Sequence, residues 1–63
     1  MEVKDVLKLE VGTLVAYYLA GWRYGHYDGT AEKGRKVKIR PIPGYKAVRA
    51  NNISVPVEDV KTI

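Results

Sequence analysis

The clearest chemical pattern in the sequence is a row of basic residues that alternates with aliphatic ones. Lys36, Lys38 and Arg40 alternate with Val37 and Ile39, which is typical of a β-strand with one buried face. The three cations would then project from one face at intervals of about 6.6–6.8 Å. A polyanion would relieve their mutual repulsion and release its own counterions on binding. We therefore predict a nucleic-acid contact along this strand, extended by basic residues in the flanking segments: Lys33, Arg35, Lys46 and Arg49.

The positive charge of the chain is concentrated in this same region. The 63 residues include 11 Lys and Arg against 7 Asp and Glu, which gives a formal net charge of +4. Residues 33–49 hold seven of the basic residues and no acidic residue, so the net charge understates how basic this part of the surface is. The alternative interpretation is that these side chains only keep the outer face of a small domain solvated.

The aromatic residues form a second pattern. The chain has five Tyr, one Trp and no Phe, and Tyr and Trp suit positions where one end of the ring is dry and the other wet. On a strand, Trp22, Tyr24 and His26 would share one face and Tyr27 the other. We predict an aromatic platform for stacking bases among Trp22, Tyr24 and Tyr27. Burial in the core is one alternative, and a cage for a methylated cation with Asp28 as its acid is another. The basic strand beside such a cage disfavours a cationic ligand.

Side chains suited to catalysis are sparse. No spacing ties the one imidazole, His26, to a hydroxyl nucleophile among Thr13, Thr30, Ser54 and Thr62. Glu58 and Asp59 are adjacent, so they would point to opposite faces of a strand or lie at the rim of a turn. The absence of cysteine excludes disulfides and thiolate metal sites. We predict a protein that is not an enzyme and that has no metal and no cofactor.

These residues need strands to position them, and the sequence predicts several short ones. β-Branched and aromatic residues, or period-two alternation, favour strands at residues 13–19, 22–30, 35–42 and 53–57. Residues 56–60 have the character of a single 3-10 turn, and residues 61–63 could close the sheet as an edge strand. The first eleven residues suit either a helix or a strand, and we favour a short helical lead-in that becomes extended by Leu9.

The connections between these strands are marked by turn residues. Ala20-Gly21 is a predicted turn, and residues 31–34 form a predicted hairpin loop with Gly34 in the left-handed region. Asp28-Gly29 is the rival position for that hairpin turn. Residues 45–52 are expected to form a loop or a short additional strand. Several short strands separated by turns, within a chain that is long enough for one domain, indicate a small antiparallel barrel.

A resemblance to a known fold is carried by four short segments of the chain. The sequence resembles SH3-like small barrels of the Tudor and KOW type over residues 9–63, through Val11-Gly12 with Val15, Trp22-Arg23 with Gly25, a strand that ends Ile39-Arg40, and the segment Val55 to Val60. The resemblance implies an all-β fold, a small five-stranded antiparallel SH3-like barrel that curls into a closed sheet, with a short 3-10 turn before the last strand. Residues 1–8 would then be a lead-in to this domain.

The C-terminal segment has a second resemblance. Residues 54–63 are similar to the end of the plasmid-encoded, trimethoprim-resistant dihydrofolate reductases, which are homotetrameric SH3-like barrels. Those enzymes carry a Val-Gln-Ile-Tyr motif just before the equivalent proline, and here the four places hold Asn52, Ile53, Ser54 and Val55. The glutamine and tyrosine that contact the ligands are absent, so the resemblance supports the fold and argues against that activity.

Together these patterns predict a non-enzymatic small binding module that contacts nucleic acid. The alternative is a protein-interaction or self-assembly module, a homo-oligomer or a partner of another protein, that uses the two-sided apolar strand at residues 13–19 and exposed aromatic rings. Residues 1–11 carry five charges, unlike a signal peptide, and the longest apolar run is far shorter than the ~20 residues that span a bilayer. We therefore expect a cytoplasmic protein without a membrane partner.

Overall fold

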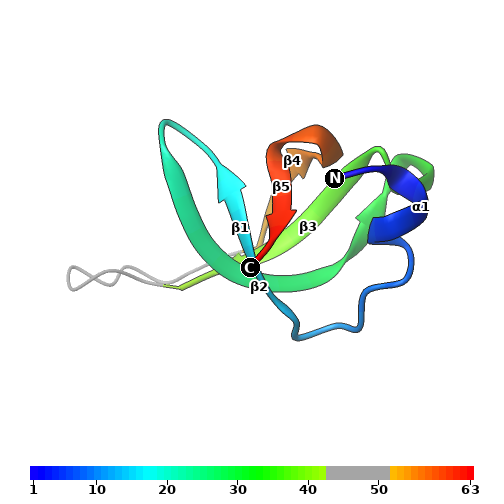
Figure 1. Ribbon diagram of the computed structural model, residues 1–63, viewed down its shortest axis with the longest axis horizontal. Coiled ribbons are helices and arrows are strands. Elements are labelled where there is room, and N and C mark those ends of the chain that lie inside the picture. The colour runs from blue at the N-terminus through cyan, green and yellow to red at the C-terminus, as the bar shows by residue number, and fades with distance from the viewer. Residues whose placement is uncertain (43–51) are drawn as a thin grey trace.

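The computed structural model describes residues 1–42 and 52–63, which form a single antiparallel sheet of five strands. The strands are β1 (Leu14–Tyr18), β2 (Trp22–Ala31), β3 (Lys36–Pro41), β4 (Ile53–Pro56) and β5 (Val60–Thr62). A short helix, α1 (Val3–Val6), precedes them, and the 3-10 turns η1 (Glu32–Gly34) and η2 (Val57–Asp59) follow β2 and β4. Figure 1 shows the sheet, whose strand order is β4-β3-β2-β1-β5. The five-stranded all-β prediction and the 3-10 turn before the last strand are confirmed.

The sheet is strongly curved, but it does not close into the barrel that we expected. The strands β4 and β5 are its two edges, and η2 carries the chain from one edge to the other. These edge strands are four and three residues long, and each pairs on one side only, β4 with β3 and β5 with β1. Much of the curvature comes from β2, which is drawn as a long arc in Figure 1. Its register against β3 shifts between Tyr27 and Thr30, and such a bulge bends a strand.

The core follows the alternation of β3, in which Val37 and Ile39 are buried and the residues between them face outward. In β1 the three central residues, Val15 to Tyr17, are all buried. The core cluster is mostly valine, a β-branched residue that packs well on a pleated surface. Its members are Val6, Val15, Tyr17, Tyr27, Val37, Ile39, Val55, Val57 and Val60.

The N-terminal segment is an integral part of this core. α1 buries the side chain of Val6 completely, and the backbone nitrogen of Met1 donates hydrogen bonds to the carbonyl oxygens of Val57 (3.1 Å) and Val60 (2.8 Å). The helical lead-in that the sequence predicts is therefore present at residues 3–6. Residues of the predicted lead-in, 1–8, thus pack against the predicted domain at residues 9–63.

The turn between β2 and β3 lies where the sequence analysis favoured it. η1 occupies residues 32–34, and Gly34 adopts a φ of +91°, which is accessible to glycine at little cost. An added Cβ at this position would come within 2.7 Å of Val3 Cγ1 in α1, so the helix packs directly on the hairpin loop. The rival turn at Asp28-Gly29 is instead the site of the bulge, and β2 continues through it to Ala31.

Most of the predicted element bounds agree with the structure to within one residue. The last predicted strand, residues 61–63, begins one residue earlier as β5, and Val57 belongs to η2 rather than to β4. Residues 43–51, which include most of the predicted loop or strand at 45–52, lie outside the described residues. Within the two described ranges, no helix combines the length and the apolar character that a membrane crossing requires.

Candidate nucleic-acid interface

The basic residues of β3 project from the face of the sheet opposite the core, as the alternation of basic and aliphatic residues predicts. Val37 and Ile39 are fully buried in the core, whereas Lys38 and Arg40 are exposed on the opposite side of β3 and Lys36 is half-buried there. This arrangement follows from the period of two, because burying both aliphatic side chains turns the residues between them toward solvent. The segment is extended, and its cations share one face of the sheet.

Cross-strand pairing shows which side chains accompany these cations. Residues that are directly opposite each other in an antiparallel pair project from the same face. Arg40 lies opposite His26, which lies opposite Leu14 on β1. We use the term outer face for the side of the sheet that points away from the core, and its members around this row are Leu14, Ala16, Tyr18, Trp22, Tyr24, His26, Lys38, Arg40, Ile42 and Lys61.

Tyr24 lies at the centre of the outer face. Its register partner on β1 is Ala16, which in turn lies opposite Lys61 on β5. On its other side the backbone nitrogen of Ile42 donates a hydrogen bond of 3.2 Å to the carbonyl oxygen of Tyr24. Arg40 is a diagonal neighbour across the β2–β3 pair, a relation that corresponds to about 7–8 Å. Tyr24 is 58% exposed, so an exposed aromatic residue and the exposed Arg40 lie on the same surface.

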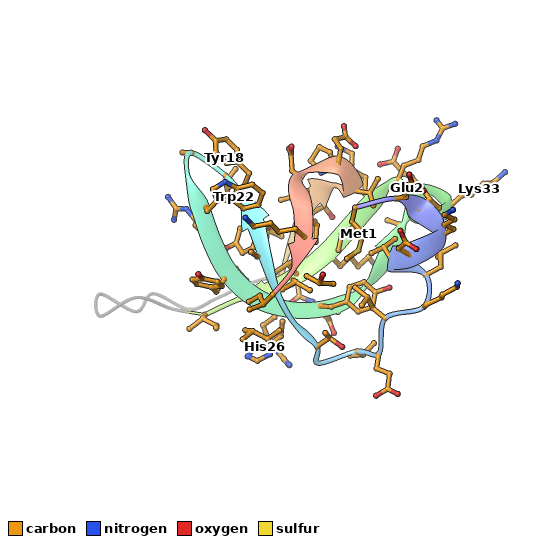
Figure 2. All side chains as sticks on the ribbon, viewed as in Figure 1. Met1, Glu2, Tyr18, Trp22, His26 and Lys33 are labelled. Carbon is orange, nitrogen blue, oxygen red and sulfur yellow. The ribbon has the colours of Figure 1, made fainter. Side chains whose placement is uncertain are left out.

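A second aromatic group lies beside the turn between β1 and β2. Trp22 is 53% exposed and packs against Tyr18, its register partner, with ring centroids 5.6 Å apart and ring planes at 78°. Figure 2 shows these two side chains together at one end of β2, with His26 farther along the strand. The ammonium of Lys61 lies 4.1 Å from the centroid of the Trp22 ring, a cation–π contact that also fixes the position of the positive charge on β5.

Asp28 brings a carboxylate to the outer face. Asp28 lies two positions after His26, just before the bulge in β2, and its Oδ2 accepts a hydrogen bond from Nδ2 of Asn52. In residues 1–42 and 52–63 the one ion pair joins Lys4 to Glu2, on a different part of the surface. Lys38, Arg40 and Lys61 are therefore not neutralised by a described carboxylate within ion-pair distance.

The structure separates the predicted basic residues into two groups. Lys38 and Arg40 lie on the outer face, where Arg40 is the diagonal neighbour of Tyr24, whereas Lys33 and Arg35 belong to the turn between β2 and β3. Figure 2 shows Lys33 next to α1, at the opposite end of the molecule from Trp22. Lys36 is close to that turn, opposite Ala31 on β2. Two further predicted residues, Lys46 and Arg49, lie outside the described residues.

Two of the three residues of the predicted aromatic platform are exposed in the structure. Trp22 and Tyr24 are exposed, but Tyr27 is only 4% exposed and belongs to the core cluster. Its inclusion in the platform is wrong, because Tyr27 lies opposite the fully buried Ile39 in the β2–β3 ladder and so points to the core face. A ring in that position has no face open to a ligand.

Several residues of the outer face were missed by the sequence analysis. Lys61 reaches the platform only because β5 pairs with β1, a contact between distant parts of the chain that leaves no local signal. Tyr18 could have been found, since a turn at Ala20-Gly21 places it opposite Trp22. Leu14 and Ile42 extend the platform as exposed apolar side chains.

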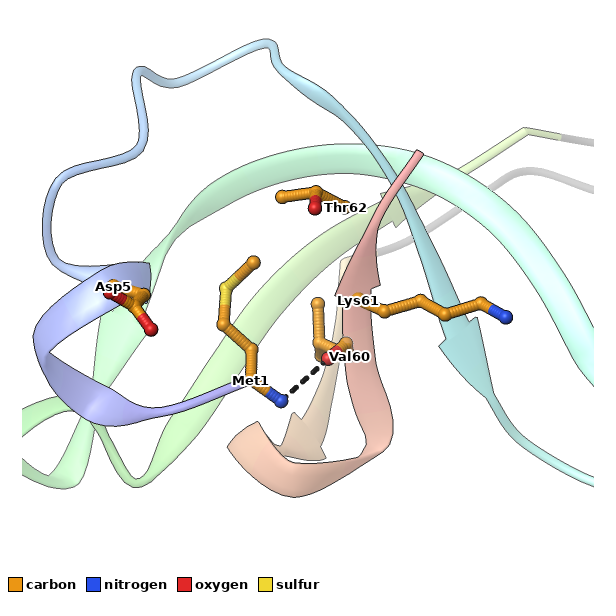
Figure 3. A pocket seen from close by; sticks show the side chains of 5 residues that line it. All are labelled: Met1, Asp5, Val60, Lys61 and Thr62. Atoms are coloured by element: carbon orange, nitrogen blue, oxygen red, sulfur yellow. Dashed lines mark hydrogen bonds between the residues drawn. The ribbon is translucent and has the colours of Figure 1, made fainter.

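A shallow pocket lies elsewhere, between α1 and β5. It has a volume of about 420 Å³ and is lined by Met1, Asp5, Val60, Lys61 and Thr62. Figure 3 shows Lys61 extending away from Asp5, so the two opposite charges do not converge on the pocket. His26 is not part of this pocket, and its Nδ1 lies 3.1 Å from the carbonyl oxygen of Gly12. Among the residues that the structure describes, no three His, Cys, Asp or Glu side chains are grouped to hold a metal ion.

Comparison of the chain with models of protein families, with curated proteins and with solved structures found no match. A function must therefore be inferred from the chain's own residues, and the outer face is the surface on which charged and aromatic side chains converge.

Proposed function

We propose that this protein is a non-enzymatic binding module that contacts nucleic acid through the outer face of its sheet. The observation that supports this proposal best is that Lys38 and Arg40 share an exposed face with the exposed ring of Tyr24. The two cations would neutralise backbone phosphates, and the ring would contact a base. Because phosphate contacts carry no sequence information, binding would be weakly selective for sequence and strongly dependent on salt.

The fold is also in keeping with the SH3-like resemblance. The strand order β4-β3-β2-β1-β5 and the 3-10 turn between β4 and β5 support a relation to small barrels of the Tudor and KOW type. The chain contains no cysteine, which suits a reducing compartment, and we propose that the protein acts in the cytoplasm.

Reversing the two outer-face charges of β3 is expected to weaken nucleic-acid binding strongly. In the double variant Lys38→Glu/Arg40→Glu, two phosphate contacts are lost and two repulsive ones replace them. We expect the affinity at about 50 mM salt to fall by at least tenfold, and the slope of log K against log salt to become shallower by about 1.4 to 1.8. Fluorescence anisotropy of a labelled oligonucleotide, measured from about 50 to about 200 mM salt, gives both quantities.

The matched control is Lys4→Glu/Lys8→Glu. Each Lys-to-Glu or Arg-to-Glu change removes two units of charge, so both double variants lower the net charge from +4 to zero. Lys4 and Lys8 are exposed near α1, away from β3, and the control should keep most of the affinity. Equal losses in the two variants would show that only the total charge matters. Absence of any binding by the unmodified protein at about 50 mM salt would refute the proposed function itself.

Self-assembly is the second candidate function, and the apolar residues of the same face favour it. Leu14, Tyr18, Trp22 and Ile42 are exposed around Tyr24, and contiguous apolar surface of this kind marks interaction sites. A second copy of the chain could cover these residues, which would add stability to a domain of this small size. Sedimentation at high micromolar concentration would detect such an oligomer, whereas a strictly monomeric protein would exclude it.

A further inference from the structure

The exposed aromatic residues of the outer face favour one form of nucleic acid over the other. Trp22 and Tyr24 are each more than half exposed, although aromatic side chains contribute most to stability when they are buried. In a duplex the flat faces of the bases are stacked on one another, and only their edges and the backbone are accessible. In a single strand the bases can be splayed out and can stack on aromatic side chains. A duplex would therefore have no base face available to stack on these rings.

Cations lie on both sides of the rings. Lys61 lies on β5 and Arg40 lies on β3. Between these two strands lie β1, which carries Ala16, and β2, which carries Tyr24. With adjacent strands about 4.8 Å apart, β5 and β3 are separated by about 14 Å across the sheet. A short segment of single strand that crosses the sheet would thus find positive charge for its phosphates at each end and an aromatic ring for a base between them.

The two rings have different roles in this arrangement. The ammonium of Lys61 covers one face of the Trp22 ring at 4.1 Å, and Tyr18 packs edge-on against the same residue. We therefore assign base stacking to Tyr24, which is the more exposed residue and the diagonal neighbour of Arg40. Trp22 is the only tryptophan of the chain, and its emission would report when a ligand occupies the adjacent surface.

From this geometry we infer that the ligand of the outer face is single-stranded nucleic acid, with a base stacked on Tyr24 and phosphates at Arg40 and Lys61. This inference rests on the proposed function and specifies its substrate class. The ring supplies an interaction that a duplex cannot use, so the protein discriminates between the two forms by stacking rather than by charge.

The test compares a short oligouridylate and oligothymidylate with a duplex of the same length, at about 50 mM salt. Binding is followed by the emission of Trp22 and, independently, by the anisotropy of a labelled strand. We expect the single strands to bind roughly tenfold to a hundredfold more tightly than the duplex and to change the Trp22 emission. Tyr24→Ala should lower the affinity for the single strands by a similar factor and leave the weak duplex binding unchanged.

Two matched variants control for changes in folding. Tyr24→Phe keeps the stacking ring and should bind nearly as the unmodified protein does. Leu7→Ala removes an exposed apolar side chain at the end of α1, and it should not alter binding. Circular dichroism of each variant establishes that the sheet is intact, and an intact Tyr24→Ala variant with unchanged single-strand affinity would overturn the inference.

The results of these binding experiments distinguish a failure of this inference from a failure of the proposed function. Duplex binding that is as tight as single-strand binding would overturn the single-strand assignment while nucleic-acid binding stands. Failure of all three probes to bind would refute the proposed function and this inference together. Concentration-dependent emission of Trp22 without nucleic acid, abolished by Tyr24→Ala, would assign the face to a second copy of the chain and would also overturn the inference.

Discussion

Gly25→Ala is expected to destabilise the protein by about 3 kcal/mol. This value lies at the upper end of the range that is typical when extra atoms are forced into a well-packed core. Gly25 is buried in β2, where an added Cβ would come within 2.5 Å of Ile39 Cγ2, 3.0 Å of the Arg40 carbonyl oxygen and 3.2 Å of Tyr17 Cε1. Ile39 is fully buried and cannot move aside cheaply, and the carbonyl oxygen belongs to the backbone of β3. Urea denaturation followed by circular dichroism measures the change in the free energy of unfolding.

Gly12→Ala is the control for this variant. Gly12 has a φ of +99°, and an added Cβ would meet nothing within 4 Å, so its cost is only the backbone strain of about 1–2 kcal/mol. The expected order, with Gly25→Ala the more harmful, depends on close packing between β2 and β3. A larger loss at Gly12 than at Gly25 would show that this close approach is not present in solution.

Ile39→Ala is expected to lower the free energy of unfolding by about 2–5 kcal/mol, because it leaves a cavity at the centre of the core. Ile39 is fully buried on β3, between its register partners Tyr27 and Ile53. In so small a domain, a loss of this size removes a large share of the total stability. The midpoint of chemical denaturation gives the measurement.

Ile42→Ala provides the matched comparison for Ile39→Ala, since it makes the same substitution on the outer face. Ile42 directly follows β3 and is 48% exposed, so we expect a change within about 0.5 kcal/mol. Similar losses at both positions would contradict the assignment of the core and outer faces. The proposal for nucleic acid would fall with that assignment, because it depends on Lys38 and Arg40 pointing away from Ile39.

The orientation of β3 could be predicted from the sequence because it is a local property. Alternation of Val37 and Ile39 with basic residues allows one burial pattern for a strand with one dry face, and the structure has that pattern. The turn at Gly34 is local in the same sense, since it requires a residue that tolerates positive φ. Closure of the sheet was predicted wrongly because it depends on the tilt and stagger of all five strands, which the local pattern of each strand does not specify.

The composition of the candidate site could be predicted only in part. Side chains alternate between the two faces of a strand, so Trp22 and Tyr24 project from one face and Tyr27 from the other. The sequence predicts that one of these faces is the core face, but it does not identify which one. The outcome depends on the packing of Tyr27 against Ile39 across the β2–β3 pair. Lys61 joins the site through the pairing of β5 with β1, and a long-range pairing of this kind leaves no periodic signal near the residue itself.

The position of β5 next to β1 has a consequence for the order in which the molecule assembles. β1 pairs with β2, and β2 with β3, through short turns, and such hairpins form within microseconds because little chain entropy is lost. β5 must instead find a partner near the other end of the chain, where Val15 lies opposite Thr62. We therefore expect docking of this last strand to be a late event that follows formation of the β1–β2–β3 meander.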